Sequence, residues 1–440
     1  MKHPLNQSNT LHYVSGRPLE CLAQWHAAKP DGGSLLLVDF TFSQYWLPGS
    51  DVLALTAIYY LDDDGVVWLS VTDQALAHSD SNPGRQYTVW AEQHKFARVI
   101  QGEALRLSPG YIPKPWGQEI WLTGVEQRGV CCIEARGGET PIPWLQAAMP
   151  DETLGAAGMP LILLKILDPV AEPVVGDLYF ELHEEKREVY VVTHVDEGAW
   201  PGGTGYIRFG FEPGRRAQYA DEDSFRGVYL EAVRCYEKVR RALDAQGSEL
   251  APDVSGLIKE ERQLREQMDS FTHMKPLRIG DVVKVPLLTP HALQHGVRTI
   301  EFQTPVYERK ILSFAQKVLT QDHWDTTEAV AQMQLEQPEP DQFQILPQGG
   351  GIRVERIVDF SDFEVRRVSL QGGQSLDDLI IEAYALVMVV QGQLQVEEAV
   401  YGPEQALLLP RNWHGVLAAV EPASTLVFLL ALPCKEAVES

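Results

Sequence analysis

Short runs of apolar residues that alternate with polar ones, or that are rich in β-branched side chains, recur along most of the chain. Near the N-terminus they cover residues 34–40, 52–60 and 65–71, with turn signals such as Asn-Pro-Gly at 82–84 between such runs. A period of two is typical of strands with one buried face. Short strands with glycine-containing turns return after residue 351. The pattern therefore predicts a mainly β protein.

The hydrophobic period changes between residues 221 and 273. Apolar side chains recur there at spacings of three and four, first over 229–243 and again over 264–271. This period is that of an amphipathic helix, and Gly247 and Pro252 separate the two segments. We expect a pair of helices inserted between β-rich segments.

Changes in composition divide the chain further. Proline, glycine and aromatic residues crowd residues 109–121, and a stretch rich in proline and glutamine begins at residue 337. We expect three domains, which are a β-rich N-terminal domain at 1–107, a barrel domain with the helical insert at 108–336, and a C-terminal barrel at 337–440. No residue pattern indicates what the N-terminal domain does.

The charge of the chain excludes some classes of partner. Its 440 residues include 37 Lys and Arg against 61 Asp and Glu, a formal charge of -24. Such a charge repels nucleic acid and anionic membranes, so we expect neither as a partner. We find no signal peptide and no long apolar run, and the five cysteines lack the spacing of a zinc knuckle. A reduced, cytoplasmic protein is the expectation, while the oligomeric state is not indicated.

Four polar residues stand out as possible metal ligands. Glu181 and His183 are two apart in a strand-like run, so they point to the same side. The charged segment 184–187 predicts a hairpin turn that sets Glu188 across from His183, and His291 follows a later strand. Imidazole and carboxylate suit zinc, iron, manganese or nickel alike. An isolated Glu-x-His is more commonly a pair of buried polar groups, so both interpretations stay open.

Around these residues the chain resembles type I mannose-6-phosphate isomerases of the cupin superfamily. The resemblance extends over about residues 108–440 and rests on five short motifs: Leu163-Leu-Lys-Ile-Leu-Asp168, Glu181-Leu-His183, Lys186-Arg-Glu188, Pro286-Leu-Leu-Thr-Pro-His291 and Glu301-Phe-Gln303. It implies a bicupin, which is a mainly β fold of two cupin-type jelly-roll barrels with a helical insert. The β-rich N-terminal domain is then an addition to that fold.

The resemblance also implies functional residues. It places one divalent metal, with zinc as the first candidate, on four ligands: Glu181, His183, Glu188 and His291. It further implies Glu301 as the carboxylate that transfers a proton and Arg309 as a catalytic arginine beside the substrate.

An aldose–ketose isomerase must move a proton between C1 and C2 of a sugar, and it must hold the phosphate of its substrate. A carboxylate such as Glu301 suits the first task. Cations hold phosphate, and Lys186 and Arg309 are candidates because they flank the ligands in sequence, with Lys114 as a further one. In the alternative interpretation, Arg309 forms a structural ion pair with an acidic neighbour, and the lysines are solvated.

Two positions depart from the family pattern. Glu181 replaces the family's glutamine, so two carboxylates would neutralise a 2+ ion, and Leu288 replaces a glycine. The leading hypothesis is a metal-dependent sugar-phosphate isomerase that converts mannose 6-phosphate to fructose 6-phosphate. One alternative is a non-catalytic, regulatory cupin that binds a sugar or sugar phosphate, and another is a metal-dependent oxygenase.

Overall fold

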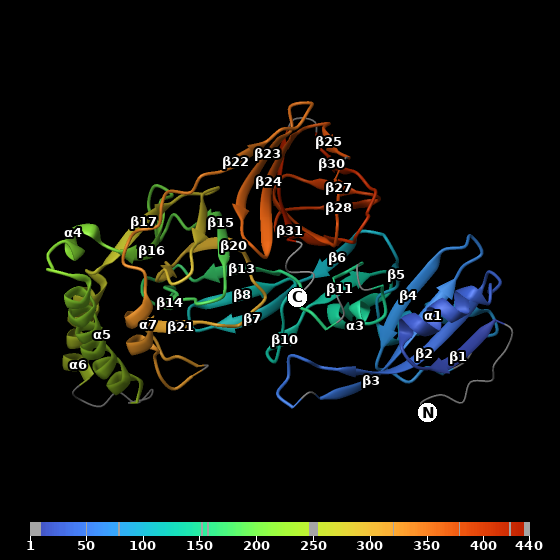
Figure 1. Cartoon of the computed structure of the whole chain (residues 1–440), viewed down its shortest axis with the longest axis horizontal. Coiled ribbons are helices and arrows are strands. Elements are labelled where there is room, and N and C mark those ends of the chain that lie inside the picture. Colours follow the sequence, from blue (N-terminus) through green and yellow to red (C-terminus); the bar gives the residue numbers. More distant parts are fainter. Residues whose placement is uncertain are drawn as a thin grey trace. The chain divides into compact units, whose positions relative to one another are not determined.

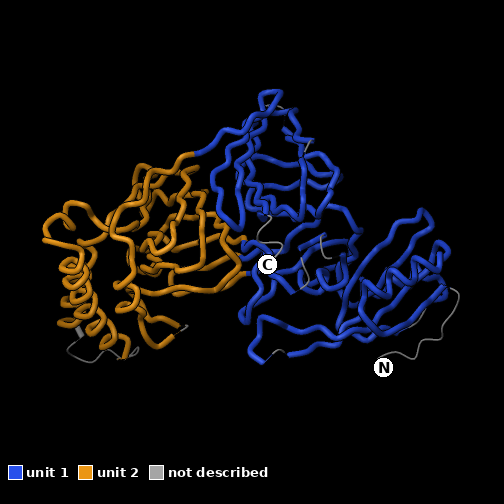
Figure 2. The backbone as a smooth tube through the Cα atoms, viewed as in Figure 1, with its two compact units in different colours: residues 1–110, 121–163, 343–440 blue, residues 111–120, 164–342 orange. Residues whose placement is uncertain are grey.

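A computed structural model describes most of the chain (Figure 1). The described residues are 10–49, 51–77, 80–150, 153–155, 158–245, 254–319, 321–377, 379–421 and 424–434. The chain divides into two compact units (Figure 2). Unit 1 comprises Met1–Gly110, Trp121–Leu163 and Phe343–Ser440, and unit 2 comprises Tyr111–Ile120 and Leu164–Gln342.

The N-terminal part of unit 1 is a five-stranded sheet with two helices. Its strands follow one another in the order of the chain: β1 (Leu11–Ser15), β2 (Ser34–Ser43), β3 (Val52–Leu61), β4 (Val67–Thr72) and β5 (Val99–Ile100). The helices are α1 (Pro18–Ala27) and α2 (Pro83–His94). Leu37 and Ile58 of the sheet are buried in one apolar cluster with Trp90 of α2. The predicted strands are confirmed, whereas the helices were not anticipated.

The Asn-Pro-Gly segment at 82–84 begins a helix and is not a turn between strands. The Asn82 side chain accepts a hydrogen bond from the backbone N–H of Arg85 at 2.9 Å, and Pro83 is the first residue of α2. Asparagine caps orphan N–H groups and proline fits the first helical position, so the same residues that favour turns also favour this start.

The C-terminal part of unit 1 is the predicted second barrel. A nine-stranded sheet has the order β12-β11-β6-β29-β26-β31-β24-β23-β22, and a four-stranded sheet has the order β25-β30-β27-β28. The strands of the larger sheet are β6 (Leu105–Ser108), β11 (Cys132–Ala135), β12 (Gly138–Pro141), β22 (Gln344–Leu346), β23 (Arg353–Asp359), β24 (Phe363–Gln371), β26 (Ala385–Gln391), β29 (Ala406–Leu409) and β31 (Thr425–Pro433). Those of the smaller sheet are β25 (Ser375–Leu376), β27 (Leu394–Val396), β28 (Ala399–Tyr401) and β30 (Leu417–Ala419).

Both sheets of this barrel contribute to one apolar core, with Leu370, Leu394 and Phe428 among its fully buried members. Unit 1 also contains β9 (Val125–Glu126), β10 (Gly129–Val130) and α3 (Ile142–Gln146). The division into three domains stays a prediction. The second of these domains, 108–336, contributes residues to both compact units.

Unit 2 contains the other barrel, which also has two sheets. Its six-stranded sheet has the order β18-β15-β20-β13-β8-β7, and its five-stranded sheet has the order β17-β16-β19-β14-β21. The strands are β7 (Gly110–Lys114), β8 (Gly117–Trp121), β13 (Leu163–Pro169), β14 (Phe180–Leu182), β15 (Glu188–Val195), β16 (Gly205–Phe211), β17 (Thr272–Leu277), β18 (Val282–Val285), β19 (His291–Leu293), β20 (Val297–Gln303) and β21 (Lys310–Ser313). Side chains from both sheets, including Val192 and Ile207, form its apolar core.

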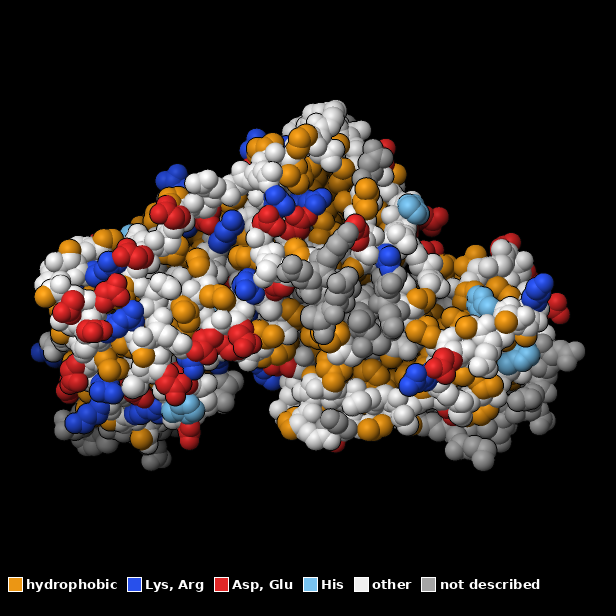
Figure 3. Space-filling model, in the orientation of Figure 1, with side chains coloured by type: hydrophobic (Ala, Val, Ile, Leu, Met, Phe, Trp, Pro, Cys, Tyr) orange, Lys and Arg blue, Asp and Glu red, His pale blue; other side chains and the backbone are white. Residues whose placement is uncertain are grey.

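The helical insert is present in unit 2. It consists of α5 (Glu222–Asp244) and α6 (Val254–Asp269), and two short helices, α4 (Pro213–Arg216) and α7 (Thr326–Gln332), lie outside it in the sequence. Phe225 and Tyr229 of α5 are buried, and both contact the ring of Phe211 in β16. Charged side chains cover the outer surface of α5 and α6 (Figure 3), as expected for amphipathic helices. Gly247 and Pro252 lie outside the described residues.

One local prediction is wrong. The charged segment 184–187 does not close a hairpin, because β14 belongs to the five-stranded sheet and β15 to the six-stranded one. The chain instead crosses from one wall of the barrel to the other at this point, and β15 pairs with β18 and β20. A charged, solvated segment suits either connection, so its composition could not distinguish them.

Candidate metal centre and its buried charge network

The four predicted ligands come from both sheets of the unit 2 barrel. Glu181 lies in β14 with His183 just after it, Glu188 begins β15, and His291 begins β19. Glu181 is the direct cross-strand partner of His291. His183, Glu188 and His291 are buried, with at most 2% of each residue exposed, and 16% of the Glu181 side chain is exposed. The fold therefore brings together residues that are far apart in the chain.

Their polar atoms converge on one point. The Nε2 atom of His183 lies 3.4 Å from Glu188 Oε2 and 3.8 Å from Glu181 Oε1, and His291 Nε2 lies 3.2 Å from Glu188 Oε2. Ligand atoms of Glu181, His183 and His291 all lie within 4.8 Å of one another. Donors bonded at about 2.1 Å to one metal are roughly 3–3.5 Å apart, so the contacts of 3.4 and 3.2 Å between Glu188 and the two imidazoles fit a shared cation, whereas Glu181 Oε1, at 3.8 Å from His183, lies slightly farther out.

Hydrogen bonds fix the orientation of both imidazoles. His183 Nδ1 donates to the carbonyl of Glu308 and His291 Nδ1 to that of Thr289, each at 3.0 Å. Because a carbonyl only accepts, each imidazole holds a proton on Nδ1, and each Nε2 faces the centre. His183 Nε2 is buried and has no hydrogen-bond partner among the described residues. His291 Nε2 lies within hydrogen-bond distance of Glu188 Oε2. When neutral, each imidazole would present its Nε2 lone pair to a cation bound there.

The position of Leu288 helps to place His291. Leu288 has a φ of +62°, the left-handed conformation that glycine adopts without steric cost. Its N–H donates to the carbonyl of His183 at 2.7 Å, and its carbonyl accepts from Gln334. Leu288 thus takes up a left-handed backbone conformation, and its hydrogen bond ties the loop before His291 to His183, just after β14.

Glu188 is the most strongly held of the four ligands. Lys186 Nζ lies 2.6 Å from its Oε1, and the Tyr190 hydroxyl donates to its Oε2 at 2.7 Å. Burial by itself would raise the pKa of Glu188, but the Lys186 ammonium and His183 outweigh it and hold that pKa well below its ordinary value. Burial, followed by the Lys186 charge, lowers the pKa of His183. Both groups are thereby kept in the forms that ligate metals.

A chain of buried ion pairs extends from the same centre. Lys165 Nζ lies 3.3 Å from Glu301 Oε2 and 3.7 Å from Glu119 Oε1, and Lys114 Nζ lies 3.0 Å from Glu119 Oε2. Burial raises the pKa of Glu301 well above its ordinary value; Lys165 opposes this shift and the nearby Glu188 carboxylate adds to it. Only 1% of Glu301 is exposed, and its Oε1 has no hydrogen-bond partner among the described residues.

Arg309 reaches the centre from the other side. Its Nη1 lies 3.5 Å from Glu181 Oε2, and its guanidinium lies over the ring of Tyr179 at 4.4 Å. Burial by itself would raise the pKa of Glu181, but the Arg309 guanidinium, followed by His183, Lys186 and His291, together outweigh it and lower that pKa. Arg309 thus forms the ion pair of the alternative interpretation while it stays 24% exposed at the side chain.

The structure therefore brings together the predicted metal ligands, Glu301, Lys186 and Arg309, and it connects Lys114 to them through Glu119 and Lys165. No sequence motif pointed to Glu119. Tyr190 could have been found, because it is two residues after Glu188 and so faces the same side of β15.

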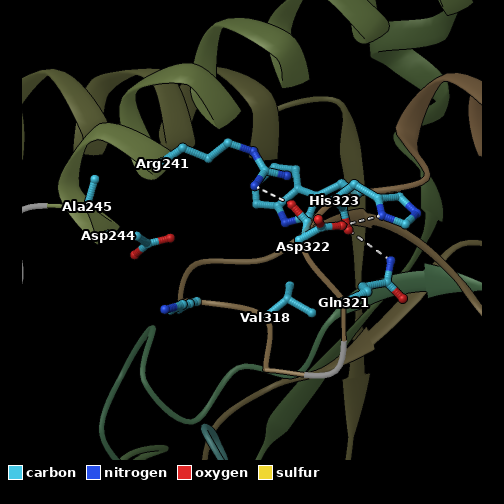
Figure 4. Close-up of a pocket in the computed structure, with 9 residues that line it drawn as sticks. Arg241, Asp244, Ala245, Val318, Gln321, Asp322 and His323 are labelled. Carbon is cyan, nitrogen blue, oxygen red and sulfur yellow. Dashed lines mark hydrogen bonds and ion pairs between the residues drawn. The ribbon is translucent and has the colours of Figure 1, made fainter.

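A separate pocket in unit 2 contains none of these residues. Its volume is about 270 Å³, and residues at the end of α5 and in the segment 317–324 line it (Figure 4). Arg241 donates to the carbonyl of Asp322, and His323 pairs with the carboxylate of Asp322. These groups bond to one another at the surface, and we assign the pocket no role in the chemistry.

None of the described helices has the length and apolar character that crossing a membrane requires.

No protein-family model matches the chain, and no curated protein sequence does so. Several solved structures, in contrast, are similar to the structure of this chain. Mannose 6-phosphate isomerase from Bacillus subtilis is 13% identical, with a TM-score of 0.53 over 75% of this chain and 99% of that one. A zinc-bound mannose 6-phosphate isomerase is 14% identical, with a TM-score of 0.53 over 75% of this chain and 100% of that one.

The apo form of mannose 6-phosphate isomerase from Salmonella typhimurium is 14% identical, with a TM-score of 0.52 over 76% of this chain and 99% of that one. Each of these proteins is thus matched over nearly its whole length. At such identities the similarity establishes the architecture: the chain has the mainly β, cupin-type fold of the phosphomannose isomerases.

Proposed function

We propose that this protein is a divalent-metal-dependent aldose–ketose isomerase of a sugar phosphate, with mannose 6-phosphate and fructose 6-phosphate as the first substrates to test. The observation that carries the proposal is the cluster of Glu181, His183 and His291, whose ligand atoms lie within 4.8 Å of one another, with Glu188 Oε2 at 3.4 and 3.2 Å from the two imidazoles. The fold shared with mannose 6-phosphate isomerases, one of them zinc-bound, supports the same function.

The residues of the centre have distinct tasks in this proposal. Glu181, His183, Glu188 and His291 would hold the metal, which when bound supplies a Lewis acid for the substrate oxygens. Glu301 would carry the proton between C1 and C2, because it is a buried carboxyl whose pKa burial raises well above its ordinary value, and a carboxyl can both take and give a proton. Lys165 would hold the Glu301 carboxyl in place through their ion pair.

Binding of the phosphate falls to the cations of the centre. Lys186 and Lys114 are each already paired with a buried carboxylate, at 2.6 and 3.0 Å. Arg309 is more exposed, and its contact with Glu181 is longer, at 3.5 Å. We therefore propose Arg309 as the main phosphate-binding residue and Lys186 as a secondary one.

A coupled assay tests the proposal. The zinc-loaded protein is given mannose 6-phosphate, and fructose 6-phosphate is measured. We expect turnover that a chelator abolishes, and a loss of about 10²- to 10⁴-fold in kcat for Glu301→Gln. Glu328→Gln, at a carboxylate with 72% of its side chain exposed, is the matched control and is expected to keep its activity. Normal isomerisation by metal-free protein would contradict the proposal.

One observation favours a second candidate, a non-catalytic protein that binds a sugar phosphate. Glu181 occupies the position of a neutral glutamine in the family, and here it pairs with Arg309. Two carboxylate ligands weaken the Lewis acidity of a 2+ ion, and the ion pair competes with a substrate phosphate. Saturable binding of mannose 6-phosphate by the zinc-loaded protein without any turnover would favour this candidate.

A further inference from the structure

Tyr190 lies at the candidate metal centre without being one of its predicted ligands. It is two residues after Glu188 in β15, so both side chains face the same side of the strand. In the register of the sheet, Tyr190 is the direct partner of Glu301 in β20 and of Val283 in β18. Only 4% of Tyr190 is exposed. This buried phenol therefore lies beside both a candidate ligand and the candidate proton carrier.

The contacts of Tyr190 are with candidate ligands. Its hydroxyl donates to Glu188 Oε2 at 2.7 Å, and its ring lies near the imidazole of His291, with the ring centroids 6.1 Å apart. Glu188 Oε2 is also the oxygen that faces both imidazoles, at 3.4 Å from His183 Nε2 and 3.2 Å from His291 Nε2. The phenol thus bonds to the same oxygen that a cation held by these imidazoles would use.

The two oxygens of Glu188 have different partners. Lys186 Nζ lies 2.6 Å from Oε1, whereas the Tyr190 hydroxyl bonds to Oε2. A carboxylate oxygen has about two lone-pair sites, so Oε2 can accept the phenol proton and still bind a metal. Rotation of the carboxylate would break both contacts. The ammonium and the phenol together therefore determine which oxygen of Glu188 faces the imidazoles.

We propose that Tyr190 is a positioning residue of the metal centre, whose hydroxyl keeps Glu188 Oε2 directed at the bound cation. Hydrogen-bond partners of this kind orient metal ligands and strengthen metal binding. The inference rests on the proposed function, because that function requires the metal. Tyr190 itself neither binds the metal nor carries the proton in this role.

The zinc affinity of the full chain tests this role. Metal-free protein competes with a chelating dye for zinc, and the dissociation constant is measured for the unchanged protein and for Tyr190→Phe. Phenylalanine fills the same buried space and removes only the hydroxyl. We therefore expect the variant still to bind one zinc ion per chain, with an affinity that is about 10- to 100-fold lower.

Tyr229→Phe is the matched control. Tyr229 of α5 is fully buried, but its hydroxyl has no hydrogen-bond partner among the described residues. The same chemical change at this position removes no contact to the metal centre. It is expected to leave the zinc affinity within about twofold of that of the unchanged protein.

Cobalt gives a second readout that a loss of packing far from the ion would not change. The visible absorption bands of bound Co²⁺ depend on the ligands around the ion and on their orientation. We expect these bands to shift in Tyr190→Phe, because its Glu188 carboxylate is no longer held by the phenol. The bands of Tyr229→Phe are expected to coincide with those of the unchanged protein.

The outcomes separate this inference from the proposed function. Equal zinc affinity of the Tyr190→Phe and unchanged proteins would overturn the positioning role, and the proposed function would stand if the unchanged protein isomerises the sugar phosphate. Weaker zinc binding by Tyr190→Phe would support the positioning role even if the unchanged protein turns over no sugar phosphate. An unchanged protein that binds no zinc would overturn both.

Discussion

Lys165 links the two buried carboxylates Glu119 and Glu301, and its replacement by methionine tests the charge network of the unit 2 barrel. Methionine fills a similar volume without the charge. In the native chain only 11% of the Lys165 side chain is exposed, and its Nζ lies 3.3 Å from Glu301 and 3.7 Å from Glu119. Lys165→Met therefore leaves buried negative charge without its central cation.

The expected loss follows from the partners that remain. Removing one partner of a buried ion pair costs about 3–5 kcal/mol. Glu119 keeps Lys114 at 3.0 Å, so the uncompensated group is Glu301. Burial already raises the pKa of Glu301, and Lys165 opposes that shift, so the variant raises this pKa further. Proton uptake then relieves part of the penalty, and we expect a loss of about 3 kcal/mol in the free energy of unfolding.

This loss depends on pH with a definite sign. A carboxyl with a raised pKa in the folded state binds more protons folded than unfolded, so the folded state loses stability as the pH rises. Urea unfolding followed by tryptophan fluorescence, with a chelator present, is expected to give a larger loss for Lys165→Met at pH 8 than at pH 6. The double variant Lys165→Met/Glu301→Gln removes the uncompensated charge and should recover part of the stability.

Lys275→Met is a control for the loss of a lysine, since Lys275 pairs with Asp341 at 3.2 Å and 31% of its side chain is exposed. We expect it to cost at most about 1 kcal/mol. A Lys165→Met chain within about 0.5 kcal/mol of the unchanged protein would refute the reasoning. Strict additivity of Lys165→Met and Glu301→Gln would refute it equally, because the two side chains would then not interact.

Three further predictions concern separate parts of the chain. Phe225→Ala, which removes a fully buried ring of α5, is expected to lower the free energy of unfolding by about 3–5 kcal/mol in urea titrations. Asn82→Ala removes the cap of α2 and is expected to cost about 1 kcal/mol in the same measurement, a loss that Asn82→Asp should avoid. Glu181→Gln removes one ligand charge and is expected to weaken zinc binding by about tenfold in competition with a chelating dye, whereas equal affinity would show that the Glu181 charge does not contribute to metal binding.

Much of the fold could be predicted from the sequence because the strands of both barrels keep a period of two and the inserted helices keep one of three to four. The start of α2 could not, since the Asn-Pro-Gly at 82–84 is equally a turn signal and a helix start. The path after His183 could not either, because four charged residues suit a hairpin and a crossing between sheets equally well.

The candidate site could be predicted only as far as its residues belong to recognisable motifs. Glu119 lies in an aromatic-rich segment without such a motif, and its contact with Lys165 is a contact between strands that the local sequence does not encode. Sequence left Arg309 open between a substrate contact and an ion pair, and the structure places it against Glu181. Which partner a long, flexible cation chooses depends on tertiary distances, which the spacing along the chain does not give.

X-ray diffraction from crystals of the zinc-loaded protein, recorded above and below the zinc absorption edge, tests the central claim most directly. The account predicts one strong anomalous peak per chain, about 2.0–2.2 Å from Nε2 of His183, Nε2 of His291, and carboxylate oxygens of Glu181 and Glu188. A peak bound elsewhere, or no peak between these four side chains, would contradict it.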